Sequence, residues 1–350
     1  MIAHLHMKRC FDLARLGAGQ VAPNPMVGAV LVYQDEVIGE GYHKIYGGPH
    51  AEVMAVQSVP ADKRHLISKS TLYVSLEPCC IVGKTPACTS LILQEGIPKV
   101  VISCLDQTAA VSGNGIRLLQ QGGVEVVQGV LEEEGKYLAR FRNTFESKKR
   151  PYIILKYAQS VDGFLGKPDQ AIWLTNPLSK RLVHKWRTEV SAIACGSNTV
   201  LVDNPFLTAR LYPGRNPVRI LLDRRGRLSL KSNVFNQDAL TWVMTENTPA
   251  FSDLTPTHQV IAINPGQNIW TALFQQMYES GLSTLLVEGG ASILEELIKL
   301  ELWDEARVFT SPIVLKSGIM APRISESKLI NESLILKDKL QFFHSFARTS

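Results

Sequence analysis

A histidine, two cysteines and a glutamate stand at spacings that could build a catalytic zinc site. The stretch His50-Ala51-Glu52 is followed by Glu77-Pro78-Cys79 and then by Cys88. One imidazole nitrogen and two thiolates can hold Zn²⁺ while its fourth position stays open to water, whereas a structural zinc site is normally closed by four protein ligands. Glu52 could then carry protons to a leaving amine. This set is typical of a zinc deaminase that acts on a nucleobase-like ring and releases ammonia.

The complete set is more specific than any of its members. A single buried histidine or cysteine is more often a packing residue than a metal ligand. Here the set appears in one order, after a predicted strand and before a predicted helix, and we therefore predict Zn²⁺ on His50, Cys79 and Cys88. Glu52 is predicted as the catalytic acid and base. Cys80 adjoins the second ligand and is expected to point elsewhere as a packing residue.

The predicted secondary structure explains how these side chains would meet. A strand is expected over residues 71–76, and helices are expected from near His50 and over 86–94, with Pro86 in the first turn. The other elements of the first half are a helix over 2–16, a hairpin over 27–32 and 37–41, and strands over 99–103 and 124–127. Strands interleaved with helices predict an α/β fold with a mostly parallel sheet.

A polar, basic break, Ser147-Lys148-Lys149-Arg150-Pro151, divides the chain into two domains of ordinary size. We predict a zinc-dependent deaminase domain over residues 1–147 and a second α/β domain over 151–350. The second domain is predicted to contain strands over 152–157, 192–195, 218–222, 240–244 and 284–287, and helices over 177–189 and 293–300.

Composition indicates a soluble globular chain, with 45% hydrophobic and 20% charged residues. Apolar runs such as 27–33 are too short to cross a membrane, and the first ten residues lack a signal-peptide core. Six scattered cysteines do not suggest a disulfide framework, which indicates a cytoplasmic location. The net charge of +5 is diffuse, whereas nucleic-acid binding needs a concentrated basic stripe. We therefore expect neither a nucleic-acid nor a membrane partner.

Further stretches around the zinc set resemble the deaminase half of the bifunctional riboflavin-biosynthesis deaminase–reductase family. They are residues 23–28 (Pro-Asn-Pro-Met-Val-Gly), 41–43 (Gly-Tyr-His) and 83–88 (Gly-Lys-Thr-Pro-Ala-Cys). The eight residues between the two cysteine ligands add specificity, because most cytidine-type deaminases have two. The resemblance implies a cytidine-deaminase-like zinc domain in which Asn24, His43 and Lys84 face the substrate.

Two stretches depart from the family pattern. The chain has Cys80-Ile81-Val82 where the family usually carries Ser-His-aromatic, and Asp106-Gln107-Thr108-Ala109 where it carries Asp-Pro-Asn-Pro. Isoleucine cannot form the hydrogen bonds of histidine, and threonine differs from asparagine in its donors and acceptors. The metal and proton-transfer residues are kept, so we expect altered recognition of the pyrimidine, with a shifted substrate or a weakened deaminase as the two consequences.

The second half carries stretches at 155–163, 196–210 and 286–290 that resemble the reductase half of the same family, whose fold is like dihydrofolate reductase. The resemblance implies an NADPH-dependent reductase domain over 151–350. The implied cofactor-binding residues are Ala158, Trp173, Thr199, Asp203, Gly290, Ala291 and Ser292. The implied substrate-binding residues are Ala171, where the family usually has serine, and Arg187, Leu207, Arg210 and Glu288.

The residues of the second half support this assignment in part. Gly289-Gly290 would let backbone amides approach a phosphate at a helix start, although a tight strand–helix turn uses the same residues. No G-x-G-x-x-G motif is present, so a Rossmann dinucleotide site is not indicated. Arg187 and Arg210 could clamp a phosphate as planar forks, with solvated surface arginines as the alternative.

The sequence thus predicts a bifunctional enzyme, a homo-oligomer that uses Zn²⁺ and NADPH on a small pyrimidine ribosylamine phosphate. It would deaminate a diaminohydroxy-phosphoribosylaminopyrimidine to the aminouracil and then reduce the ribosyl group to ribityl. One alternative is that only one half is active, with deaminase recognition altered at Ile81 and Thr108. The others are a nucleic-acid deaminase with an appended binding domain, and a zinc-containing structural or ligand-sensing protein, which would need a fourth protein ligand.

Overall fold

The protein divides into two compact units, Met1–Arg150 and Pro151–Ser350. A computed structural model describes residues 2–83, 85–108, 110–168, 170–324 and 326–346. The polar break predicted over residues 147–151 starts later than predicted, because helix α5 (Glu132–Lys148) continues through Ser147. Lysine and glutamate are good helix formers, so a charged run can prolong a helix as easily as it can end one.

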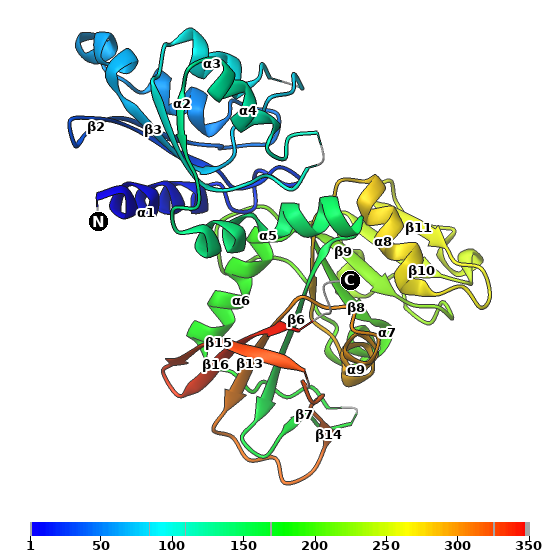
Figure 1. Ribbon diagram of the computed structural model, residues 1–350. Coiled ribbons are helices and arrows are strands. Elements are labelled where there is room, and N and C mark those ends of the chain that lie inside the picture. Colours follow the sequence, from blue (N-terminus) through cyan, green and yellow to red (C-terminus); the bar gives the residue numbers. More distant parts are fainter. Residues whose placement is uncertain (1, 84, 109, 169, 325, 347–350) are drawn as a thin grey trace. The chain divides into compact units, whose positions relative to one another are not determined.

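The first unit is built on a mixed sheet (Figure 1). Among the described residues this sheet has five strands in the order β2-β1-β3-β4-β5. They are β1 (Gly28–Tyr33), β2 (Glu36–Tyr42), β3 (Thr71–Leu76), β4 (Lys99–Cys104) and β5 (Glu125–Val127). The pairs β3–β4 and β4–β5 are parallel, whereas β1 runs antiparallel to both β2 and β3. The prediction of parallel pairing is therefore correct for β3, β4 and β5, beside which both cysteine ligands lie, and the predicted hairpin of β1 and β2 is confirmed.

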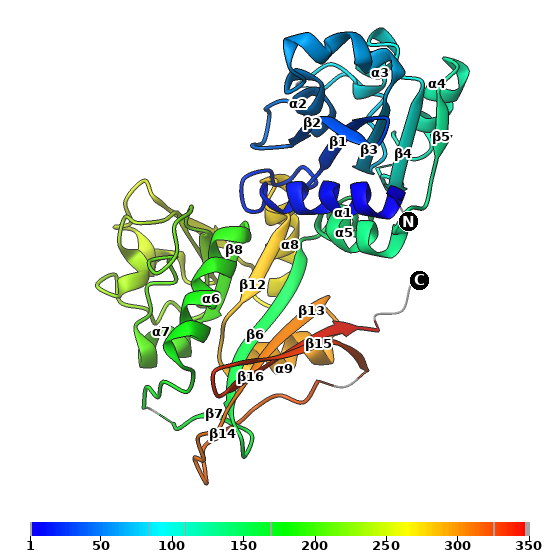
Figure 2. The same cartoon turned by 90° about the vertical axis from the view of Figure 1, so that its left-hand side faces the viewer.

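Helices cover both faces of this sheet (Figures 1 and 2). Helix α1 (Ile2–Arg15) and α5 pack on one face, in a cluster with Val30 and Val101. The opposite face is covered by α2 (Ala51–Gln57), η1 (Ala61–Lys69), α3 (Cys88–Gln94) and α4 (Asn114–Gln121). The core on that face includes Leu72, Val100 and Ile102, all fully buried. This packing brings α2 and α3 together beside the carboxyl end of β3.

The second unit contains a longer sheet, which among the described residues has nine strands in the order β11-β10-β9-β8-β12-β6-β13-β16-β15. The seven strands from β11 to β13 pair in parallel, and β16 and β15 add antiparallel. The strands are β6 (Tyr152–Ser160), β8 (Ala192–Gly196), β9 (Val218–Leu222), β10 (Thr241–Thr245), β11 (His258–Ala262), β12 (Thr284–Val287), β13 (Glu305–Ser311), β15 (Ser327–Ile335) and β16 (Asp338–Ser345). The short strands β7 (Phe164–Gly166) and β14 (Ile319–Met320) pair with each other.

Helices again lie on both faces of this sheet. Helix α8 (Ile269–Glu279) and α9 (Ala291–Lys299) contribute to the larger core, whereas α6 (Pro177–Glu189) packs on the other face through Val183 and Trp186. Helix α7 (Ser197–Asp203) follows β8, and the turns η2 (Asn233–Phe235) and η3 (Thr248–Phe251) lie between later strands. The predicted helix over 177–189 is confirmed, as are the predicted positions of β8, β9 and β12.

No helix within the described ranges combines the length and the apolar character needed to cross a membrane.

Candidate active sites

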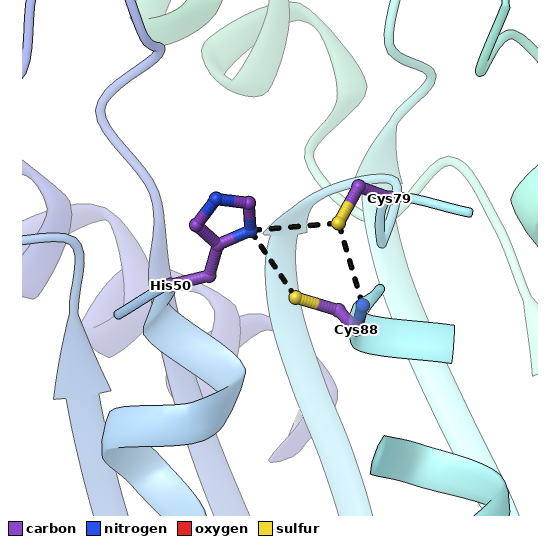
Figure 3. Close-up of side chains that lie close together, drawn as sticks. All are labelled: His50, Cys79 and Cys88. Atoms are coloured by element: carbon purple, nitrogen blue, oxygen red, sulfur yellow. Dashed lines mark hydrogen bonds between the residues drawn. The ribbon is translucent and has the colours of Figure 1, made fainter. Parts of the chain in front are cut away.

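The three predicted zinc ligands converge in the first unit (Figure 3). His50 Nδ1 lies 3.3 Å from Cys88 Sγ and 3.5 Å from Cys79 Sγ, and the three ligand atoms all lie within 4.8 Å of one another. Around a tetrahedral Zn²⁺ with bonds of about 2.1 Å to nitrogen and about 2.3 Å to sulfur, the nitrogen and a sulfur would be about 3.6 Å apart. The geometry therefore fits Zn²⁺, with Nδ1 as the histidine ligand.

Each of these side chains stands where a secondary-structure element begins or ends. His50 precedes α2, Cys79 follows β3, and Cys88 is the first residue of α3. The predicted helix start at Pro86 is wrong by two residues, because Ala87 keeps an extended backbone with ψ of 136°. In this arrangement the backbone N–H of Cys88 donates a hydrogen bond to Cys79 Sγ at 3.3 Å.

The protonation of the two sulfurs also fits a metal. A hydrogen bond from Cys88 lowers the pKa of Cys79 to about 4, and the same contact raises the pKa of Cys88. The closeness of the two sulfurs therefore favours one negative charge on the pair over two. Two thiolates can lie this close together only beside a positive ion, so the donor set suits a divalent metal.

Glu52 lies on α2 and faces the same cavity as the ligands. Its side chain is buried, and the cavity of about 280 Å³ is lined by Glu52, His50 and Cys79 among other residues. Burial raises the pKa of Glu52, because the charged form is withdrawn from water. A carboxyl group in this position can exchange protons with a molecule held at the ligands.

Asn24 and His43 form a hydrogen-bonded pair on the wall of this cavity. His43 Nδ1 lies 2.9 Å from the carbonyl oxygen of Pro49, which can only accept, so Nδ1 carries the proton. Burial lowers the pKa of His43, and the neutral ring then accepts at Nε2 from Asn24 Nδ2 at 3.0 Å. This orientation allows Asn24 Oδ1 to accept from a ligand. Lys84, the third residue expected to face the substrate, lies outside the described residues.

The two departures from the family pattern lie on the same cavity wall. Ile81 and Thr108 both line the cavity, and Ile81 exposes 46% of its surface. The hydroxyl oxygen of Thr108 is buried, and no hydrogen-bond partner for it lies among the described residues. This wall therefore combines an apolar surface with one hydroxyl that a ligand could satisfy.

Two neighbours of the ligands hold the surrounding loops together. The Glu77 carboxylate accepts hydrogen bonds from the backbone N–H groups of Gly113 and Gly115, each at 3.0 Å. It therefore fixes the start of α4 against the end of β3. Cys80 directs its thiol away from the metal ligands and donates to the carbonyl oxygen of Ala110 at 3.6 Å.

In the second unit, Glu288 binds two cations just beyond the end of β12. Arg187 donates to it from Nε at 2.8 Å and from Nη2 at 3.0 Å, and Lys156 Nζ lies 3.4 Å away. Burial by itself would raise the pKa of Glu288, but Arg187 and Lys156 outweigh it and hold the pKa at about 2. Arg187 and Glu288 are both predicted substrate-binding residues, and in the structure they pair with each other.

Arg210 extends from a loop that neighbouring side chains hold in place. Its guanidinium lies 4.3 Å from the ring centre of Phe206, and the buried Leu207 before it adopts a left-handed conformation with φ of 54°. His184 Nδ1 accepts the backbone N–H of Leu211 at 3.3 Å. Burial, together with the nearby arginines, lowers the pKa of His184 to about 4, so the imidazole is neutral. His184 stands three residues before Arg187 on α6, and the sequence predicted no role for it.

The residues implied for NADPH lie on several elements of this unit. Thr199 on α7 and Gly290, which precedes α9, are joined by a hydrogen bond from the Gly290 N–H to Thr199 Oγ1 at 3.0 Å. Asp203 ends α7, and burial raises its pKa. The other members of this set are Ala158 on β6, Ala291 and Ser292 in the first turn of α9, and Trp173. Trp173 is largely exposed beneath Lys180 Nζ, and Ala171 lies in the same loop.

Each of the two units matches a known protein family. The cytidine and deoxycytidylate deaminase zinc-binding region matches residues 2–104, and the RibD C-terminal domain matches residues 151–344. The riboflavin biosynthesis protein RibD of Aquifex aeolicus is 37% identical over 339 residues, which cover 95% of this chain and 93% of that protein. The chain belongs to the RibD family.

Other members of the RibD family are similar to this protein in sequence or structure along nearly the whole chain. RibD of Escherichia coli is 33% identical over 332 residues, which cover 89% of this chain and 88% of that protein. A solved structure from Thermotoga maritima has a TM-score of 0.89 and 38% identity, and the match covers 98% of this chain and 99% of that one. That protein is described as a diaminohydroxyphosphoribosylaminopyrimidine deaminase and 5-amino-6-(5-phosphoribosylamino)uracil reductase.

Membership of the RibD family fixes the class of activity. The chain is a bifunctional enzyme of riboflavin biosynthesis that acts on a small molecule, with a zinc-dependent deaminase and an NADP-dependent reductase. The His50, Cys79 and Cys88 group is the part of the structure that suits the zinc of the first activity.

Proposed function

We propose that the first unit deaminates a diaminohydroxyphosphoribosylaminopyrimidine and that the second unit reduces the resulting 5-amino-6-(5-phosphoribosylamino)uracil with NADPH. The single observation that carries the proposal is the His50, Cys79 and Cys88 group beside Glu52 in one cavity. The similarity to the Thermotoga maritima protein over both units supports the choice of substrates. We further propose that the protein acts in the cytoplasm as a homo-oligomer.

In the deaminase, Zn²⁺ held by His50, Cys79 and Cys88 would supply the Lewis acidity that makes water a nucleophile near neutral pH. Glu52 takes a proton from that water and delivers one to the leaving amine, so that water and the amino-pyrimidine become ammonia and the uracil. Asn24 accepts an N–H of the pyrimidine through Oδ1. His43 holds the Asn24 amide in the required orientation.

In the reductase, NADPH supplies the hydride and the protein supplies binding and orientation. Thr199, Asp203 and the turn at Gly290 would hold the cofactor, with Ala158, Trp173, Ala291 and Ser292 around it. Arg210 would bind the substrate phosphate, because its guanidinium reaches the surface whereas the fork of Arg187 is already paired with Glu288. Leu207, Ala171 and Glu288 would complete the substrate site.

Separate assays of the two half-reactions test this proposal. Purified protein with zinc is expected to release ammonia from the diaminopyrimidine and to oxidise NADPH when given the deaminated product. Zinc chelation or Cys88→Ala should abolish ammonia release and leave NADPH oxidation intact, because the metal serves only the first reaction. Cys80→Ala is the matched control and should keep both activities and the zinc measured by elemental analysis. Equal zinc content in wild type and Cys88→Ala would contradict the ligand assignment.

Arg210→Ala is expected to weaken the reductase by loss of a phosphate contact. A charge-assisted hydrogen bond contributes about 1.5–3 kcal/mol, which corresponds to a loss of about 10- to 150-fold in kcat/KM. The effect should appear mainly in the KM of the substrate, measured from initial rates of NADPH oxidation. NADPH affinity from a direct titration should hardly change. A loss of NADPH affinity with an unchanged substrate KM would show that the two binding faces are assigned the wrong way round.

A further inference from the structure

Arg142 of α5 reaches the deaminase cavity, although nothing in the sequence marks it as a functional residue. Its side chain is part of the cavity lining, together with Asn24, Glu52 and Asp106. Glu77 supplies a third carboxylate to the same lining. Among the described lining residues, Arg142 is the one lysine or arginine. An anionic ligand in this cavity would therefore meet several carboxylates, and the positive charge of Arg142 would offset their repulsion.

The guanidinium of Arg142 is only partly satisfied within the protein. Nη1 pairs with Glu146 Oε1 at 2.9 Å and makes a long contact of 3.5 Å to the carbonyl oxygen of Pro23. The Nε–H is buried, and no hydrogen-bond acceptor for it lies among the described residues. A buried donor without an acceptor is costly, so a small shift of the guanidinium that brings this N–H to a ligand oxygen would be favourable. Glu146 also lies 3.7 Å from Lys149 Nζ and would keep a cation nearby if Arg142 turned to a ligand.

The contact with Pro23 also defines which part of a ligand Arg142 would meet. Pro23 adjoins Asn24, the residue that we assign to the pyrimidine ring, so Arg142 borders the loop that holds the ring. The cavity lining continues from this loop to His50 and Cys79. A ligand with its ring between Asn24 and the zinc ligands would direct its remaining substituent, the ribose phosphate, along the cavity wall.

We propose that Arg142 binds the phosphate group of the deaminase substrate. The inference rests on the function proposed above, in which the substrate is a ribosylamine phosphate. A guanidinium presents parallel N–H donors that match phosphate oxygens, and the partly buried setting strengthens the interaction. Arg142 thereby selects the phosphorylated pyrimidine over the corresponding nucleoside.

The decisive experiment compares two substrates across a small set of full-length, zinc-loaded variants. Arg142→Met removes the cation, Arg142→Lys keeps a positive charge, and Arg117→Met removes an exposed arginine of α4 that lies outside the cavity lining. Ammonia release is measured with the phosphorylated pyrimidine and with its dephosphorylated counterpart. Arg142→Met is expected to lower kcat/KM for the phosphorylated substrate about 10- to 100-fold, mainly through KM.

The dephosphorylated substrate should be deaminated equally well by wild type and Arg142→Met. Arg142→Lys should recover part of the loss, and Arg117→Met should match the wild type on both substrates. An equal loss on both substrates would show that Arg142 only supports α5 through Glu146, and an unchanged KM would exclude any contact with phosphate. Either result overturns the inference while leaving the proposed deaminase in place.

A binding measurement keeps the inference testable if the proposed function fails. Ribose 5-phosphate is titrated into the full chain carrying Arg210→Ala, which weakens the phosphate contact of the second unit, with and without Arg142→Met. The added substitution should reduce the affinity about tenfold or more. Equal affinities would overturn the inference. Absence of ammonia release by the wild type, with this difference in affinity retained, would overturn the proposed substrate and keep the phosphate site.

Discussion

Glu52→Gln should retain zinc and lose about 10²- to 10⁴-fold of the rate of ammonia release. The amide that replaces the carboxyl group can neither take a proton from water nor pass one to the leaving amine. Its size is nearly unchanged, so the cavity and the neighbouring ligand His50 should keep their positions. The measurement is the steady-state rate of ammonia release at saturating substrate, with zinc content determined on the same preparation.

The reductase of the same variant provides an internal control. NADPH oxidation with the deaminated substrate should be unchanged in Glu52→Gln, because Glu52 belongs to the first unit and the residues assigned to NADPH belong to the second. Normal ammonia release by the variant would show that another group moves the proton. Loss of zinc together with activity would indicate instead that Glu52 holds the metal site in shape.

Arg187→Met should destabilise the second unit by about 3 kcal/mol at neutral pH. The substitution leaves the buried Glu288 carboxylate with Lys156 alone and removes the hydrogen bond to the carbonyl oxygen of Thr208, which lies at 2.9 Å. Methionine fills the volume of the arginine stem, so the loss reflects the unpaired charge. The double variant Arg187→Met with Glu288→Gln should recover part of the stability, since the isolated charge is then absent.

The pH dependence of this loss provides a stricter test. Glu288 has a pKa of about 2 in the folded protein against about 4.3 in an unfolded chain, so its ion pairs stabilise the fold above about pH 4. That stabilisation disappears as the pH falls from about 4 to about 2. In Arg187→Met burial should raise the pKa, and the difference from wild type should therefore shrink as the pH falls from 7 toward 4. An equal difference at both pH values would contradict this account.

Tryptophan fluorescence during urea unfolding suits this measurement. All five tryptophans of the chain lie between residues 173 and 303 and therefore belong to the second unit. The signal reports unfolding of the unit that contains Glu288 and Arg187, in the full-length protein. Arg181→Met, which removes a charge on the same helix without touching Glu288, serves as the matched control and should change stability little.

The zinc site could be predicted from the sequence because its residues are tied to local structure. Cys79 directly follows a strand whose apolar run is unambiguous, and His50 and Cys88 stand at helix starts. The short spacing from His50 to Glu52 places both residues at the start of α2, independently of how the rest of the chain folds. Chemistry and spacing were together restrictive enough to single out three residues that the fold brings within reach of one metal ion, and the error at Pro86 left this predicted set unchanged.

Other elements were not predicted because their sequences have no clear hydrophobic periodicity. Strand β15 is exposed along most of its length at the edge of the sheet, so its residues do not alternate between apolar and polar. It forms because β16 offers it backbone hydrogen-bonding partners. The charged residues near 147 extend α5 for a different reason, since they are exposed there and lysine and glutamate are good helix formers.

The roles of individual charged side chains were decided by the tertiary structure alone. Arg187 and Glu288 are 101 positions apart, and only the packing of α6 beside the end of β12 joins these two expected substrate-binding residues in an ion pair. Arg142 is 119 positions from Pro23 and reaches the cavity only because α5 packs on the sheet of the same unit. The sequence thus determined which chemistry the chain can perform, since that depends on residue types at short spacing. The fold determined which charged side chains are paired within the protein and which can bind a ligand, since their pairing partners are far away in the sequence.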